Sequence, residues 1–139
     1  MTERVLVPID GSEMAERALE YALETHPEAE ITVLHIAGVP SPMMGDSTGL
    51  ALEIDIEAAA EERATEIFER ARELAEPYGV DLETDVVWGS PAKVIVDRAE
   101  GFDAVVVGSH SGSLADRLFV GNVAQKVVRH SPVPVTVVR

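Results

Sequence analysis

Two patterns of apolar and polar positions alternate along the chain. Short runs of β-branched and aliphatic residues are followed by longer segments in which apolar residues recur every three or four positions. The first pattern is typical of buried strands and the second of amphipathic helices. The sequence predicts strands over residues 4–9, 30–37, 80–88, 102–107 and 132–138. It predicts helices over residues 13–24, 51–75, 91–100 and 122–129.

This order predicts an α/β fold. Strands of nearly continuous Val and Ile, separated by amphipathic helices, are typical of an open, doubly wound parallel sheet with both faces covered. The alternation within residues 80–88 favours a half-exposed edge strand. A length of 139 residues corresponds to about one domain. We therefore expect residues 1–139 to form a single domain.

Local signals mark several boundaries. Ser90 and Pro91 suit the N-cap and first position of a helix. Asp10 can cap the helix that follows the first strand, either as its only role or while also contacting a ligand. Residues 38–49, which include Met43 and Met44, are interpreted as a mobile loop because Pro and Gly are frequent there.

The charge of the chain narrows the choice of partners. Acidic residues outnumber basic ones 25 to 11, which gives a net charge of −14. Such a field repels nucleic acid and anionic lipid, so we expect neither a nucleic acid nor a membrane as partner. The same acidic surface suits work in concentrated salt, although an ordinary acidic cytosolic protein would also carry it. Cysteine is absent, and no apolar run resembles a signal peptide or a membrane span, so a cytoplasmic location is expected.

The candidate chemistry lies after the fourth predicted strand. Gly108, Ser109, His110, Ser111 and Gly112 form a small, hydroxyl-rich stretch between that strand and a helix. Such a loop is how many α/β proteins present backbone N–H groups to a phosphate. Neither the dinucleotide motif G-x-G-x-x-G nor the P-loop motif is present in the places those folds require.

A second strand end carries polar groups as well. Asp10 follows the first strand, and ligands of open α/β sheets bind beyond the carboxyl ends of strands where the strand order reverses. If the first and fourth strands are neighbours, Asp10 and Gly108 face one crevice. His35, inside an apolar strand, is interpreted as a core histidine.

The chain resembles the universal stress protein family from end to end. The matching segments are residues 5–12, 34–36, 89–91, 107–110, 121–123 and 131–138. The resemblance implies an adenine-nucleotide alpha-hydrolase-like sheet of five parallel strands in the order 3-2-1-4-5. It also implies a homodimer formed through the last strand, from Pro132 to Val138.

The resemblance further implies ATP or AMP as ligand, with Mg²⁺ as a companion of the triphosphate. Pro8 and Asp10 would contact adenine and ribose, and Ile36 would pack on the base. Ribose and phosphates would be held by the later loop and helix start: Gly108, Ser109, His110, Ser111, Gly112, Gly121, Asn122 and Val123. Against the family pattern G-x2-G-x9-G-[ST], Ser111 replaces a glycine and Asn122 replaces a hydroxyl residue.

No constellation of a nucleophile, a base and an orienting group stands out, and no metal-ligand spacing occurs. We therefore expect no catalytic and no metal-binding residues, and a stress-response protein that binds nucleotide without being an enzyme. Two alternatives stay open. One is a dimeric interaction module of the same family that binds no nucleotide, and the other is a weak ATPase.

Overall fold

The strand order predicted by the resemblance is confirmed. The structure, a computed structural model, describes residues 2–37, 49–110 and 121–139, with residues 49–56 described by their backbone alone. Its sheet has five strands in the order β3-β2-β1-β4-β5. All four pairs of neighbouring strands are parallel. The described helices make no span that is long and apolar enough to cross a membrane.

The elements follow the predicted order. The strands are β1 Arg4–Pro8, β2 Glu30–Ala37, β3 Glu83–Trp88, β4 Ala104–Gly108 and β5 Val135–Val138. The helices are α1 Glu13–Thr25, α2 Gly49–Ala75, α3 Pro91–Ala99 and α4 Asn122–His130, with a short 3₁₀ turn, η3, at Glu76–Tyr78. The predicted loop, including Met43 and Met44, lies outside the described residues except for Gly49, which begins α2.

The last strand is shorter than predicted. It begins at Val135 rather than at Pro132. Pro132 and Pro134 have no N–H group to donate to a neighbouring strand, so they precede the strand instead of forming part of it. Pro134 still accepts a hydrogen bond through its carbonyl, at 2.9 Å from the amide nitrogen of Val105.

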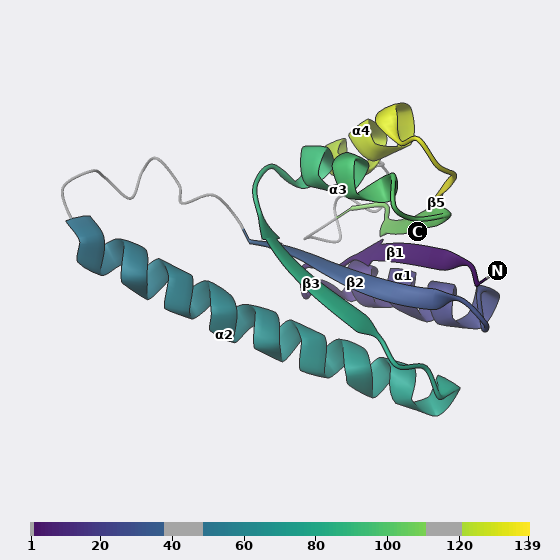
Figure 1. The fold of residues 1–139 in the computed structure, drawn as a ribbon, viewed down its shortest axis with the longest axis horizontal. Coiled ribbons are helices and arrows are strands. Elements are labelled where there is room, and N and C mark those ends of the chain that lie inside the picture. The colour runs from purple at the N-terminus through teal and green to yellow at the C-terminus, as the bar shows by residue number, and fades with distance from the viewer. Residues whose placement is uncertain (1, 38–48, 111–120) are drawn as a thin grey trace.

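The helices lie in two layers. In Figure 1, α1 and α2 lie on one side of the sheet and α3 and α4 on the other. Each layer packs on its own apolar core, one around Leu19 and Phe68 and the other around Leu6 and Ile95. From β1 the chain passes through α1 to β2 and through α2 to β3, which lie on one side of β1. From β4, on the other side of β1, it passes through α4 to β5. The boundary between β1 and β4 is therefore the point where the strand order reverses.

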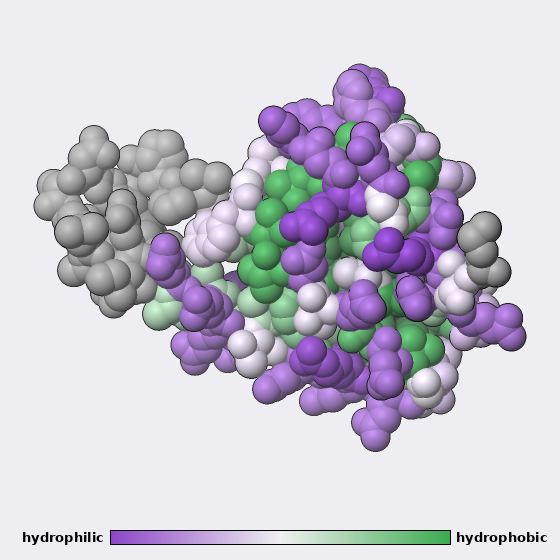
Figure 2. Space-filling model, viewed as in Figure 1, coloured by the Kyte–Doolittle hydropathy of each residue, from purple (hydrophilic) through white to green (hydrophobic). Residues whose placement is uncertain are grey.

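Position in the sheet explains the pattern of each strand. Val5, Leu6 and Val7 of the central β1 are fully buried because helices cover both faces. The edge strand β3 alternates as predicted and leaves Val86 and Trp88 exposed. In Figure 2 apolar residues reach the surface over this edge of the sheet.

His35 is a core histidine, as predicted. Its side chain is buried, and Nδ1 lies 3.1 Å from the carbonyl oxygen of Ile9. Its ring meets the ring of Phe68 edge-on, with 6.5 Å between the centroids. One nitrogen of the ring therefore has a hydrogen-bond partner inside an apolar strand.

Candidate functional site

A cavity of about 570 Å³ opens at the carboxyl ends of β1 and β4. It lies where the strand order reverses, the place at which open α/β sheets bind ligands. The ends of β1, β2 and β4 and the starts of α1, α3 and α4 contribute to its wall. The described residues that line it are Pro8, Ile9, Asp10, Ser12, Ala15, Leu34, Ile36, Pro91, Ile95, Val107, Gly108, Ser109, His110, Gly121, Asn122, Val123 and Ala124.

The two turns singled out in the sequence meet in this cavity. β1 pairs directly with β4, with Leu6 opposite Val105, so the chain segments after both strands reach the same edge. The predicted residues that line the cavity are Pro8, Asp10, Ile36, Gly108, Ser109, His110, Gly121, Asn122 and Val123. Ser111 and Gly112 lie outside the described residues.

Sequence reasoning missed much of the apolar wall. Leu34 from β2 and Ile95 from α3 line the cavity together with the predicted Pro8 and Ile36. A signal for the α3 side was available in Ser90 and Pro91. In a parallel sheet every helix that follows a strand starts at the carboxyl ends of the strands, so the start of α3 was expected on the same side as the other two turns.

Asp10 does not cap α1. The N-cap is Ser12, whose Oγ accepts a hydrogen bond from the amide nitrogen of Ala15 at 3.2 Å. Asp10 Oδ1 instead accepts from the amide nitrogen of Ser12 at 2.9 Å. Gly11 lies between them with a φ of 84°, a backbone turn that places Asp10 outside the helix. Within the described residues, Asp10 Oδ2 accepts no hydrogen bond and is open to a ligand.

Two amides at the ends of the segment between β4 and α4 are bonded within the chain and do not face the cavity. The Ser109 amide donates to the carbonyl oxygen of Val138 at 2.7 Å, and the Gly121 amide donates to the carbonyl oxygen of Ser109. These bonds hold the start and the end of the segment between β4 and α4 together. They also consume two of the N–H groups expected to approach a phosphate.

The glycines at these positions serve close packing. A Cβ on Gly108 would lie 2.7 Å from Met14 Cγ and 3.1 Å from the Met14 carbonyl oxygen, so the glycine lets β4 approach α1. A Cβ on Gly121 would lie 3.2 Å from the Ser109 carbonyl oxygen. Neither Gly108 nor Gly121 has a positive φ. Among the described glycines, only Gly11, Gly79 and Gly89 have one.

The remaining donors lie at the start of α4. Gly121 is the N-cap of this helix, and within the described residues no side chain caps it. The amides of Asn122, Val123 and Ala124 belong to the first turn and have no partner within the helix. Together with the helix dipole, these amides give the cavity an electropositive end.

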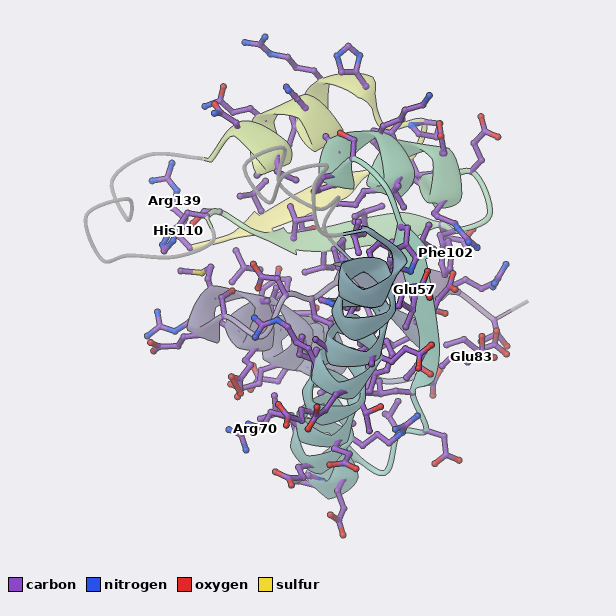
Figure 3. The ribbon with its side chains drawn as sticks, turned by 90° about the vertical axis from the view of Figure 1, so that its left-hand side faces the viewer. Glu57, Arg70, Glu83, Phe102, His110 and Arg139 are labelled. Carbon is purple, nitrogen blue, oxygen red and sulfur yellow. The ribbon has the colours of Figure 1, made fainter. Side chains whose placement is uncertain are left out.

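Two polar side chains at this end lack partners. Ser109 is 1% exposed, and its Oγ has no hydrogen-bond partner in the described part of the chain. The same holds for both ring nitrogens of His110. Figure 3 shows His110 beside Arg139, which follows β5 on the neighbouring chain segment. Buried polar atoms without partners are rare in folded proteins, so these atoms are candidates for contact with a ligand.

The described lining of the cavity carries one acidic side chain, Asp10, and one histidine, His110. Within the described ranges no three His, Asp or Glu side chains are close enough together to hold a metal ion. Asp10 is the cavity's only carboxylate among the described residues. The described lining therefore combines an apolar wall, one carboxylate and an uncapped helix start.

Comparisons with known proteins agree with the fold. YxiE, a universal stress protein of Bacillus subtilis, is 34% identical and aligns over 100% of both chains. The solved structure of protein MJ0577 of Methanocaldococcus jannaschii has a TM-score of 0.81 at 29% identity, covering 99% of this chain and 96% of that one. A universal stress protein solved in complex with cAMP has a TM-score of 0.70 at 26% identity, covering 99% of this chain and 97% of that one.

A family model adds a match over the whole length. The model described as the universal stress protein family matches residues 1–139. It includes every element of the sheet and every described residue of the cavity. The chain belongs to the universal stress protein family.

Proposed function

We propose that the cavity binds an adenine nucleotide, AMP or ATP, and that the protein acts in the cytoplasm as a nucleotide-binding protein of a stress response. The observation that carries this proposal is the unpartnered Ser109 hydroxyl beside the uncapped start of α4, opposite the free Asp10 carboxylate oxygen. A nucleotide has chemical groups for all of these positions. The cAMP complex of a structural relative supports the choice of an adenine ligand.

Each part of the cavity suits one part of the ligand. The apolar wall formed by Pro8, Ile36 and Ile95 suits the flat base. The free oxygen of Asp10 can accept a hydrogen bond from a ribose hydroxyl. Ser109 and the first amides of α4 can donate to phosphate oxygens.

Magnesium fits the described lining only as a companion of the nucleotide. Mg²⁺ prefers oxygen ligands in an octahedral arrangement and is usually bound through one or two carboxylates together with substrate phosphates. The described lining offers one carboxylate, and one oxygen of Asp10 already accepts the Ser12 amide. We therefore expect the protein to hold the nucleotide and the phosphates to hold the ion.

Equilibrium dialysis of the full chain with labelled AMP and ATP tests the proposal. Retention of either nucleotide at submillimolar concentration is expected. No retention would favour a nucleotide-free interaction module, and phosphate release above background would favour a weak ATPase.

We also propose that the protein forms a homodimer through β5. In the sheet β5 pairs with β4 only, and its other edge is open within the described residues. The carbonyls of Pro134 and Val138 accept from β4, so the amide and carbonyl of Val137 point toward the open edge. An aliphatic strand with unpaired backbone groups favours pairing with another strand.

Val137→Pro should convert the dimer to a monomer. Proline removes the N–H group on the open edge while the bonds to β4 remain. Val137→Ala is the matched control, because it loses the same apolar packing and keeps the N–H. Light scattering at micromolar concentration measures the mass. A wild-type monomer, or a Val137→Pro dimer as tight as the control, would contradict the proposal.

A further inference from the structure

A long-range contact ties α2 to the turn that carries Asp10. Arg63 Nη2 donates to the backbone carbonyl oxygen of Asp10 at 3.0 Å, across 53 residues of sequence. Arg63 lies on a helix rich in glutamate, yet it forms no ion pair within the described residues. Its guanidinium therefore donates to a neutral backbone carbonyl of the turn and not to a neighbouring carboxylate.

The turn is tightly enclosed on this side. A Cβ on Gly11 would lie 3.4 Å from Arg63 Nη2 and 3.3 Å from Ile67 Cγ1. On its other side, the Ser12 amide donates to Asp10 Oδ1. The Asp10 carboxylate is thus oriented by a local bond, and the backbone that carries it is fixed by a distant one.

Open space lies next to this contact. A hollow of about 210 Å³ between α1 and α2 is lined by Gly11, Ile67 and both Arg63 and Arg70. Arg63 is absent from the described lining of the nucleotide cavity. Without the Arg63 side chain, the turn would face this hollow and could shift away from its position at the cavity.

We propose that Arg63 is a positioning residue for the nucleotide site, acting through the backbone of Asp10. This inference depends on the nucleotide-binding function proposed above. Displacing a polar contact by about 1 Å weakens it strongly, so affinity should depend on Arg63 although Arg63 touches no ligand. The charge of the guanidinium strengthens its bond to the carbonyl.

The test compares nucleotide affinity in matched arginine variants. Arg63→Ala should weaken nucleotide binding about tenfold, which corresponds to roughly 1.4 kcal/mol. Arg72→Ala removes an exposed arginine from the same helix without touching the turn, and should leave the affinity unchanged. In an Asp10→Ala background, Arg63→Ala should have little further effect on affinity, because the carboxylate whose position Arg63 is proposed to control is then absent.

A second readout is independent of nucleotide. Hydrogen exchange of the Ser12 amide should become faster in Arg63→Ala, since this amide bonds to Asp10 Oδ1 within the turn. If Arg63→Ala does not fold, Arg63→Met, which keeps the apolar stem and lacks the donor, takes its place in every measurement. If exchange is faster in Arg63→Ala but the wild type binds no nucleotide, the proposed ligand is wrong and the contact of Arg63 with the turn still holds. A wild type that binds, with unchanged affinity and exchange in the variant, would overturn the role of Arg63.

Discussion

Replacing Gly108 with valine should lower the melting temperature by about 6–10 °C, corresponding to a loss of roughly 2 kcal/mol. The new Cβ would lie 2.7 Å from Met14 Cγ and within 3.2 Å of two backbone atoms of Met14. Either α1 or β4 must move to make room. The helix and strand both belong to the packed interior, where such shifts are costly.

The expected loss of stability in Gly108→Val is opposite to what strand preferences alone would predict. Glycine inside a strand is less favourable than alanine by about 0.5–1 kcal/mol, and valine fits strands well. In open space the substitution would therefore stabilise the protein. Gly101→Val, in the turn after α3, is the control for a valine added without a clash, because a Cβ there meets nothing closer than 3.7 Å and the φ is ordinary. Differential scanning calorimetry of both variants measures the difference.

Two further results discriminate between packing and ligand binding at Gly108. Met14→Ala removes one of the clashing atoms, so the cost of Gly108→Val should be smaller in the Met14→Ala background, although the backbone contacts remain. A Gly108→Val variant that melts like the wild type and only loses nucleotide would contradict this account. That result would instead indicate that Gly108 is needed to let a phosphate approach the backbone.

The sequence predicted the elements and the position of the site for clear physical reasons. Apolar periodicity follows directly from which faces are buried, so the order of strands and helices was correct along the described chain. The start of the last strand is an exception, because Pro132 and Pro134 lack the N–H group that a paired strand donates, and the strand begins only at Val135. The strand order itself came from the family resemblance, because periodicity does not specify which strands are neighbours.

The details of the site depend on contacts that a sequence does not display. Asp10 was predicted to cap α1, but the backbone turn at Gly11, with a φ of 84°, makes Ser12 the N-cap instead. The close approach of Met14 to Gly108 joins residues 94 positions apart in the chain, so the sequence did not show it. Arg63 lies 53 residues from Asp10 and is one of many charged positions on its helix, so no local pattern singles it out.

Ser109→Ala should raise the stability of the ligand-free protein and lower its affinity for nucleotide. The buried hydroxyl has no partner within the described residues, and an unsatisfied buried polar group costs about 1–3 kcal/mol. Its removal should raise the melting temperature by about 3–5 °C for each kcal/mol gained. Losing a hydrogen bond to a charged phosphate should weaken nucleotide binding roughly tenfold or more.

A gain in stability together with a loss of affinity distinguishes a residue that binds the ligand from one that stabilises the fold. Ser131→Ala is the matched control, because the Ser131 hydroxyl donates to the Val133 carbonyl at 2.7 Å and accepts from the Val133 amide at 3.1 Å. That variant should lose about 1 kcal/mol of stability and keep its affinity. Calorimetry and nucleotide titration on both variants give the comparison. If Ser109→Ala destabilises the protein as Ser131→Ala does, the Ser109 hydroxyl is satisfied within the chain, and the cavity loses the polar group on which its assignment as a phosphate site depends.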